Sequence, residues 1–376
     1  MKAIVVVKSG EAAIVEKAEP ELRPEYVKVK VRAVALNPKP EADRTTLLPA
    51  DWKHIDFFAR GGETVGCDFS GIVTEIGSVV TSDVSVGDAI YGLVHGSKVG
   101  CRDTGAFAEY AVVKDGLFAK MLSNQTFEDA ATWGSATATN ILGLWQKLDL
   151  PTPSQPAKEK FPLLVYGGSS AMGMIAIQLA RLAGLYVVTT ASERNFELLR
   201  REYGADAVFN YNDPDCAALI RQETGDNLRY VFDCISNESS ARISAESLAP
   251  SATAAGTLHY SMLLPVDSFP RSDVEQSFVL GYTAFGEAFE FLARQYQPAP
   301  ADYAICTRYW PLITSLIAEG AEGRKEQRDE ASLPDIEIGD VVDLGKKSSS
   351  SRTLGAALQG TPSEFGSALR SPANRL

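Results

Sequence analysis

The sequence has few residues of the kinds that bind metal ions or form disulfides. Its 376 residues include only three histidines and five cysteines. No two cysteines are close enough in the chain for a Cys-x-x-Cys motif, and an odd number in a chain of this size indicates free thiols. A zinc site or a Ser-His-Asp hydrolase would need His54, His95 or His259, with scattered partners such as Cys67. We therefore expect no metal.

The sequence also lacks features of proteins that act in membranes or on nucleic acids. No apolar run approaches the roughly 20 residues that a bilayer span requires, and the short apolar start, Ala3 to Val7, is typical of a first strand rather than a secretion signal. The net charge at pH 7 is −12, which repels phosphate backbones and anionic lipid headgroups. We expect a cytoplasmic protein with no nucleic-acid or membrane partner.

The length and the order of predicted elements indicate two domains. A chain of 376 residues is too long for one core of ordinary size. In the first part, runs such as Val27–Val31 and Gly71–Ile76 are typical of half-buried antiparallel strands. A helical stretch over Phe127–Leu148, capped by Asn124 or Thr126, leads into alternating apolar strands and helices. That alternation predicts a parallel sheet covered on both faces.

These patterns divide the chain into four predicted segments. Residues 1–126 are mostly β, residues 127–265 form a doubly wound α/β domain of the cofactor-binding type, and residues 266–322 return to mixed character. Residues 323–376 are an atypical tail, because the charge run Glu322–Glu330 and the serine-rich run Lys346–Arg352 favour a solvated or disordered segment.

One turn carries most of the chemical information. From Leu163 to Met174 (Leu-Leu-Val-Tyr-Gly-Gly-Ser-Ser-Ala-Met-Gly-Met), an apolar strand enters a helix through Gly167 and Gly168. Glycines let the main chain approach a ligand closely, and the N–H groups at the start of the following helix favour a pyrophosphate. The turn is a relaxed relative of the Gly-x-Gly-x-x-Gly motif, and the βα units beyond it favour a dinucleotide site over an ordinary glycine-containing turn.

The end of the next strand indicates which dinucleotide binds. NAD-binding folds usually carry an acidic residue there, which accepts from the ribose 2′-hydroxyl. Here the strand leads into Ser192-Glu193-Arg194-Asn195. The hydroxyl of Ser192 and the guanidinium of Arg194 favour a 2′-phosphate and hence NADPH. Glu193 would oppose a phosphate if it faced inward, so we expect its side chain in solvent. The sequence has neither the Gly-Lys-Ser/Thr of a P-loop nor a Gly-x-Ser-x-Gly nucleophile elbow.

Several segments together resemble a known family. Gly66–Gly71, Val86–Asp88, Gly105–Tyr110 and the Gly167 turn resemble zinc-independent medium-chain dehydrogenases of the quinone-reductase branch. Zinc-dependent relatives carry Gly-His-Glu where this chain has Gly66-Cys67-Asp68. The resemblance implies a GroES-like, mostly β catalytic domain over residues 1–126 and 266–322, and a Rossmann doubly wound parallel-sheet domain that binds NADPH over residues 127–265.

Within that branch the chain most resembles the trans-acting enoyl reductases of fungal highly reducing polyketide synthases. The resemblance covers roughly residues 1–320, and its matching segments are Asn37-Pro38, Asp51–His54, Ser192–Phe196, Asp206–Tyr211, Phe232–Ile235 and Gly281–Glu287. It implies NADPH-dependent reduction of the α,β-unsaturated thioester of a polyketide intermediate on an acyl carrier protein. Hydride would reach the β-carbon, and the resulting enolate oxygen would need a donor or a positive charge.

The resemblance also implies the site residues. Those implied to contact NADPH are Ala50, Asp51, Trp52, Lys53, Gly168, Ser169, Ser170, Ala171, Met172, Ser192, Glu193, Arg194, Asn195 and Tyr211. Those implied to line the acyl pocket are Thr139, Asn140, Gly281, Tyr282, Thr283, Ala284 and Phe285. Lys53 and Thr139 are the expected catalytic residues. The alternatives are a surface charge for Lys53, a buried helical threonine for Thr139 and a surface helix-start residue for Arg194.

The chain departs from the family pattern in two places. Lys39–Ala50 is an insertion directly upstream of Lys53, and residues 323–376 match nothing of the usual closing helix and strand. A retained intron and a frame change in the gene would explain both, and they predict that the chain as written folds poorly or lacks activity.

Two other functions stay open: a stand-alone quinone or enone reductase, and a non-catalytic NADPH-binding partner protein. Quinone reductases often pair through the edge strand of the cofactor sheet. We expect Pro265 and Pro270 to disrupt such an edge here, which together with the family resemblance favours a monomer.

Overall fold

The computed structural model describes residues 1–36, 50–58, 60–251 and 256–330. Within these ranges the chain forms two compact units. Unit 1 comprises residues 1–36, 50–58, 60–138 and 282–330, and unit 2 comprises residues 139–251 and 256–281. None of the described helices combines the length and the apolarity needed to cross a bilayer.

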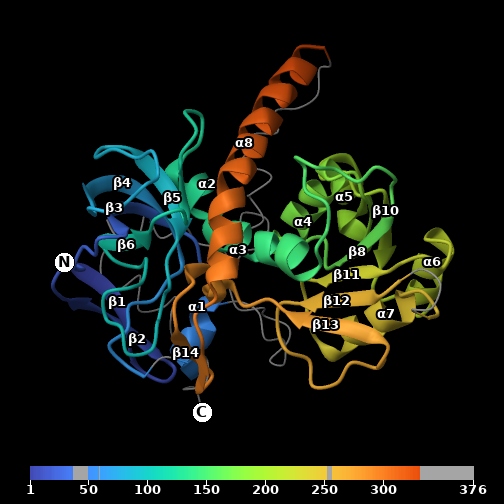
Figure 1. Cartoon of the computed structure of the whole chain (residues 1–376), viewed down its shortest axis with the longest axis horizontal. Helices are drawn as coiled ribbons and strands as arrows, with labels where there is room; N and C mark the ends of the chain where they lie inside the picture. Colours follow the sequence, from blue (N-terminus) through green and yellow to red (C-terminus); the bar gives the residue numbers. More distant parts are fainter. Residues whose placement is uncertain (37–49, 59, 252–255, 331–376) are drawn as a thin grey trace. The chain divides into compact units, whose positions relative to one another are not determined.

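Unit 1 is mostly antiparallel β (Figure 1). Its main sheet has the order β6-β3-β4-β5-β7, formed by β3 (Tyr26–Val34), β4 (Asp68–Ile76), β5 (Ala89–Leu93), β6 (Tyr110–Lys114) and β7 (Phe118–Lys120). Two antiparallel hairpins accompany it: β1 (Lys2–Lys8) with β2 (Glu11–Glu16), and β14 (Phe289–Phe291) with β15 (Arg294–Tyr296). Its helices are α1 (Ala50–Lys53), the π-helical η1 (His54–Phe58), α2 (Phe127–Ala131) and α8 (Pro300–Glu330).

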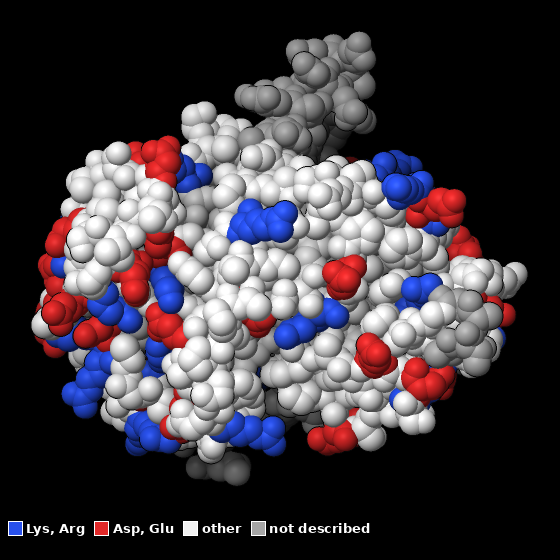
Figure 2. Space-filling model, in the orientation of Figure 1, with Lys and Arg blue, Asp and Glu red and all other residues white. Residues whose placement is uncertain are grey.

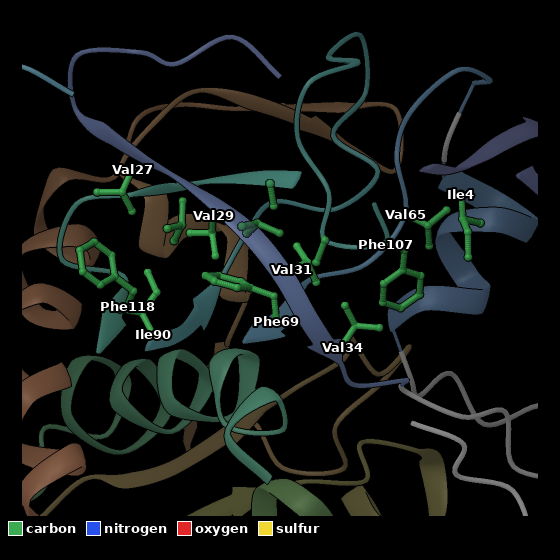
Figure 3. Close-up of a cluster of buried hydrophobic side chains, with 14 of the residues drawn as sticks. Ile4, Val27, Val29, Val31, Val34, Val65, Phe69, Ile90, Phe107 and Phe118 are labelled. Atoms are coloured by element: carbon green, nitrogen blue, oxygen red, sulfur yellow. The ribbon is translucent and has the colours of Figure 1, made fainter. Parts of the chain in front are cut away.

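The core of unit 1 lies against one face of this sheet. Val27, Val29 and Val31 alternate along β3 and are buried. Figure 3 shows them with Phe69 of β4 and Phe118 of β7 in the same cluster. Because side chains in a strand point alternately to its two faces, the sequence pattern of β3 is enough to place this face inside.

Unit 2 is a doubly wound α/β unit. Its six strands are all parallel in the order β10-β9-β8-β11-β12-β13, with β8 (Pro162–Tyr166), β9 (Tyr186–Ala191), β10 (Ala207–Asn210), β11 (Tyr230–Asp233), β12 (Leu258–Met262) and β13 (Val274–Phe278). The helical segments are η2 (Ile141–Lys147, π-helical), α4 (Ala171–Leu182), η3 (Glu193–Asn195, 3₁₀), α5 (Phe196–Arg201), α6 (Cys216–Glu223) and α7 (Glu238–Ser247). The chain starts at β8 and later returns to its other side at β11, so the topological switch point lies between these strands. The predicted fold class, a GroES-like β domain with a Rossmann domain, is confirmed.

The boundaries between the units differ from the predicted ones. The first lies at 138/139, within α3 (Gly134–Asn140), rather than at 126/127, and the second lies at 281/282, within η4 (Gly281–Phe285), rather than at 265/266. The first predicted boundary lies too near the N-terminus because α2 packs on β3, β4 and β5 of unit 1. The second predicted boundary lies too near the N-terminus because β13 still belongs to the parallel sheet of unit 2. A helix is a property of local sequence, but the body on which it packs is not.

Three local predictions also need correction. The helix expected over Phe127–Leu148 is divided into α2, α3 and η2, although Thr126 caps its start as predicted. Pro265 and Pro270 precede the edge strand β13 instead of interrupting it, so that argument for a monomer is wrong. The tail expected to be solvated or disordered from residue 323 begins as helix over residues 323–330, because α8 continues to Glu330 through a run of good helix formers. The inserted residues Lys39–Pro49 and residues 331–376 lie outside the described residues.

Candidate active site

The glycine turn lies at the switch point of unit 2. Gly167 follows β8 with a φ of 83°, a conformation that favours glycine. The N–H of Gly167 donates to Thr190 Oγ1 at 3.0 Å, and that of Gly168 to the Thr190 carbonyl at 2.9 Å. A Cβ on Gly168 would lie 2.1 Å from Thr189 Oγ1. The end of β9 therefore holds the turn, and no side chain fits at Gly168.

The N-terminus of α4 follows this turn directly. Ser170 is the N-cap: its Oγ accepts from the N–H of Gly173 at 3.1 Å and donates to the Gly167 carbonyl at 2.7 Å. A Cβ on Gly173 would lie 2.3 Å from the Gly167 carbonyl oxygen, so the helix packs tightly against the turn. The N–H groups of Ala171 and Met172 lie in the first turn, where an α-helix supplies no acceptor. Such a helix start suits an anionic group.

The loop after β9 is a short 3₁₀ turn with a fixed shape. Ser192 precedes it, and Asn195 donates both its backbone N–H to the Ser192 carbonyl (2.9 Å) and its side-chain Nδ2 to Ser192 Oγ (3.2 Å). Glu193 and Arg194 are exposed, as expected for Glu193. The carboxylate of Glu193 nevertheless has a partner, since it accepts from Asn210 Nδ2 at 3.0 Å. Tyr211, the next residue, is 41% exposed.

A buried carboxylate organises the loop after β11. Asp233 accepts from the N–H groups of Ile235 and Ser236 at 2.8 Å each, and from the hydroxyls of Ser240 (2.6 Å) and Tyr260 (2.7 Å). Burial raises the pKa of Asp233, while these four donors oppose the rise. A side-chain atom of Ile235 lies 2.5 Å from the place that a Cβ on Gly167 would take. By accepting from the Ile235 N–H, Asp233 therefore holds the residue that packs against the glycine turn. No role was predicted for it, although its place at the carboxyl end of a predicted strand was a usable signal.

Two predicted pocket residues also meet in unit 2. Thr139 Oγ1 lies 3.6 Å from where a Cβ on Gly281 would be, although 142 positions separate them (281 − 139). Thr139 is half-buried and Asn140 is fully buried. Thr139 lies in α3 with part of its surface exposed, so its role in the acyl pocket and the alternative of a buried helical threonine both stay predictions.

Lys53 is a buried lysine of unit 1. It ends α1 with its residue surface 4% exposed, and burial lowers the pKa of Lys53 to about 8 because an ammonium group loses its hydration. No charged group among the described residues offsets this burial. The surface-charge alternative for Lys53 is wrong. Asp51, also buried, and the backbone of Ala50 and Trp52 belong to the same helix.

A hydrogen bond connects the segment after Lys53 with the predicted acyl-pocket segment. The Tyr282 hydroxyl lies 2.8 Å from His54 Nε2 and 3.3 Å from Cys67 Sγ. The Tyr282 ring stacks on His95 with centroids 4.1 Å apart. Burial lowers the pKa of His95 well below its usual value and raises that of Tyr282, so both are neutral. His54, His95 and Cys67, three of the four residues considered above as zinc ligands, thus surround Tyr282.

A second cluster holds the other end of that segment. The Glu287 carboxylate accepts from the Tyr26 hydroxyl at 2.6 Å, from Lys98 Nζ at 2.9 Å and from Lys114 Nζ at 3.0 Å. Lys114 also donates to the Phe285 carbonyl at 2.7 Å. These donors lower the pKa of Glu287 to about 2 against the opposing effect of burial. Segment 282–287 is therefore anchored at both ends within unit 1, and Thr283 and Ala284 lie between the anchors.

The predicted site residues fall into separate groups. Unit 2 brings together the glycine turn, the Ser192–Asn195 loop and Tyr211 near the carboxyl ends of β8, β9 and β10, as well as Thr139 with Gly281. Unit 1 carries the Lys53 helix and Tyr282–Phe285. In the described part of the chain, no three His, Cys, Asp or Glu side chains are grouped to hold a metal ion. Zinc independence stays a prediction.

Comparison with known families agrees with this architecture. The family model described as alcohol dehydrogenase GroES-like domain matches residues 23–123, and the one described as zinc-binding dehydrogenase matches residues 171–292. Among solved structures, the quinone oxidoreductase from Coxiella burnetii aligns with a TM-score of 0.54 and 24% identity, over 75% of this chain and 83% of that one. The CurK enoyl reductase aligns with a TM-score of 0.59 and 18% identity, over 87% and 96%. At these identities the structures show the fold.

Sequence comparison finds relatives with higher identity than these solved structures. Trans-enoyl reductase ACTTS2 of Alternaria alternata is 40% identical over 318 residues, which are 84% of this chain and 87% of that protein. Trans-enoyl reductase TOXD of Cochliobolus carbonum is 39% identical over 300 residues, which are 80% of this chain and 95% of that protein. The fold, the pyridine-nucleotide type of turn and these relatives agree: the chain belongs to the medium-chain dehydrogenase/reductase oxidoreductases and, within them, to the fungal trans-enoyl reductases.

Proposed function

We propose that this chain is an NADPH-dependent, trans-acting enoyl reductase that reduces the α,β-unsaturated thioester of a polyketide intermediate on an acyl carrier protein. The observation that carries the proposal is its 33–40% identity to relatives named trans-enoyl reductases, over 72–85% of its length. The glycine turn at the switch point of unit 2 supports it, because it has the form that a pyridine nucleotide requires.

The residues of unit 2 fit the diphosphate of such a cofactor. Side chains are excluded at Gly168 and Gly173, and the main chain at the start of α4 is left accessible to an anion. We assign the diphosphate to the stretch from Gly168 to Met172. The Ser192 hydroxyl and the exposed Arg194 guanidinium favour NADPH over NADH, since both can donate to a 2′-phosphate. Tyr211, exposed beside them, is assigned to the adenosine end.

The residues of unit 1 supply the charge that the reaction needs. The bound reduced nicotinamide supplies a hydride to the substrate β-carbon. The thioester oxygen then gains negative charge, and we assign Lys53 to stabilise it, because a buried cation acts more strongly in a poorly solvated site. Transfer of a proton from water to the α-carbon would then give the saturated thioester. With a pKa of about 8, Lys53 is mostly protonated at pH 7. Thr139 and Gly281 with the segment Tyr282–Phe285 are assigned to position the acyl chain.

The direct test is turnover by the purified full chain. NADPH oxidation is measured with crotonyl thioesters on pantetheine and on an acyl carrier protein, and the products are identified by mass spectrometry. We expect saturated thioester, with NADPH preferred over NADH and the carrier-bound substrate preferred over free enones. Turnover of free quinones with no response to the carrier would favour the quinone-reductase alternative. NADPH binding without turnover of any enone would favour the non-catalytic one.

A second comparison deals with the departures from the family pattern. The chain as written is compared with a variant lacking residues 39–50, and the transcript is sequenced across codons 38–51 and 320–376. We expect the shortened variant to be more soluble or more active, because the insertion ends at Ala50, the first residue of α1, and so displaces the start of the Lys53 helix. Full activity of the chain as written would contradict the expectation that it folds poorly. The carrier partner, the cytoplasmic location and the monomeric state stay predictions.

A further inference from the structure

Glu193 and Asn210 form a hydrogen bond at the carboxyl edge of the sheet in unit 2. Asn210 is the last residue of β10, and its backbone is in register with Ala191 at the end of β9. Glu193 begins η3 two residues beyond Ala191. Asn210 Nδ2 lies 3.0 Å from Glu193 Oε1. The side chain from one strand end therefore reaches across to the loop that follows the neighbouring strand.

The orientation of the Asn210 amide is determined by a second contact. The backbone N–H of Asn212 donates to Asn210 Oδ1 at 2.9 Å. Because a backbone N–H can only donate, the oxygen of the amide must face Asn212 and its nitrogen must face Glu193. A carboxylate is the acceptor that this nitrogen suits best. Asn210 is thus a preset donor for Glu193.

The loop around Glu193 has little freedom apart from this side chain. Two hydrogen bonds between Asn195 and Ser192 close it, as described above. It carries one positive side chain, Arg194, and one negative side chain, Glu193. A carboxylate close to a 2′-phosphate repels it, whereas a carboxylate close to a 2′-hydroxyl can accept from it. The position of the Glu193 side chain therefore affects NADPH and NADH in opposite directions.

We propose that Asn210 is a specificity-determining positioning residue: it holds the Glu193 carboxylate on the β10 side of the loop and so maintains the preference for NADPH over NADH. This inference rests on the proposed function, because it requires that the loop binds the 2′-phosphate. Asn210 acts through Glu193 rather than through the cofactor, so its effect must disappear when Glu193 carries no charge.

The test compares the full chain with four variants of it: Asn210→Ala, Glu193→Gln, the double variant with both substitutions, and Asn212→Ala as the matched control. The control removes an exposed amide from the same turn and keeps the backbone N–H that orients Asn210. Dissociation constants for NADPH and NADH are measured by fluorescence titration, together with kcat/KM for both. We expect Asn210→Ala to weaken NADPH binding about threefold to tenfold, and to leave NADH binding unchanged or up to about twofold tighter.

Two further results are expected. The double variant binds NADPH as tightly as Glu193→Gln alone, and the loss in Asn210→Ala shrinks at about 1 M salt, where the Debye length is about 3 Å. An unchanged NADPH/NADH ratio in Asn210→Ala, an equal loss of both nucleotides, a loss that persists in the double variant, or the same shift in Asn212→Ala would each overturn the inference. A wild-type chain that binds neither nucleotide would instead overturn the proposed function itself, before any variant is compared.

Discussion

The side chain of Lys53 is buried at the end of α1, and burial lowers its pKa to about 8 from an ordinary value of 10.5. The folded state therefore binds fewer protons than the unfolded chain between these two values. The stability contributed by this group rises as the pH rises from about 8 to 10.5, and below pH 8 the buried charge costs a constant amount, on the order of 3 kcal/mol.

Replacing Lys53 with methionine should separate stability from function. We expect Lys53→Met to raise the free energy of unfolding at pH 7 by about 2 kcal/mol, because the buried charge is removed while the chain length is kept. We expect the same variant to lose at least about 100-fold in kcat, since the enolate loses its cation. Denaturant titrations at pH 7 and pH 10.5 with steady-state kinetics check both; a destabilised variant with normal kcat would contradict the assignment.

Gly168 is the position in the glycine turn where a side chain fits least. A Cβ would lie 2.1 Å from Thr189 Oγ1, which is itself buried and donates to the Val165 carbonyl at 2.6 Å. We expect Gly168→Ala to destabilise the protein by about 2 kcal/mol and to abolish nucleotide binding, because the turn must shift. Gly281→Ala is the stability control: its Cβ would meet Thr139 Oγ1 at an ordinary 3.6 Å. Thermal melts measure stability and NADPH titration measures cofactor binding in both variants. Equal effects of Gly168→Ala and Gly281→Ala would count against the assignment of the diphosphate to the Gly168 turn.

At the scale of elements, segment 282–287 depends on one carboxylate. The pKa of Glu287 is lowered to about 2 from 4.5 by the donors Tyr26, Lys98 and Lys114, although burial opposes this. The folded state therefore binds fewer protons than the unfolded chain in this window. The stability from Glu287 is fully present above about pH 4.5 and is lost as the pH falls through 2.

Glu287→Gln should remove this dependence. We expect it to destabilise the protein at pH 7 by about 2 kcal/mol and to flatten the fall in stability between pH 4.5 and 2. KM for the acyl thioester should rise more than the dissociation constant for NADPH, because Lys114 also holds the Phe285 carbonyl. Glu246→Gln, in an exposed pair with Arg242 on α7, is the control and should change little. A wild-type chain whose free energy of unfolding does not fall between pH 4.5 and 2 would refute this role of Glu287.

At the scale of the whole molecule, the net charge of −12 would oppose encounter with the carrier protein proposed above if that carrier is acidic as well. On the face drawn in Figure 2, Lys and Arg lie as small separate groups among Asp and Glu. Repulsion between two acidic proteins slows association at low salt. We expect kcat/KM for a carrier-bound crotonyl thioester to rise about twofold to fivefold between about 0.02 and 0.3 M salt. The same thioester on pantetheine, which lacks the carrier, should show no rise; a fall for the carrier-bound substrate would instead indicate a basic docking surface.

The local sequence was enough to predict several features. The glycine turn, the Ser192–Asn195 loop and the alternating strands were recognisable because each depends on residues within a few positions of one another. The family resemblance extended this to the candidate site residues, including Lys53 and Thr139. Chain length and the order of predicted elements indicated two domains, and the lack of a long apolar run predicted no membrane segment.

Only the tertiary structure decided what depends on contacts between distant positions. The sequence does not show that Tyr282 bonds to His54, that Glu287 is bonded by three donors from other segments, or that Asn210 holds Glu193. It also did not show that α2 packs on the sheet of unit 1, or that β13 is the edge of the other sheet. The physical reason is the same in each case: backbone preference and hydrophobic period act locally, whereas side-chain partners and burial are determined when separate elements pack.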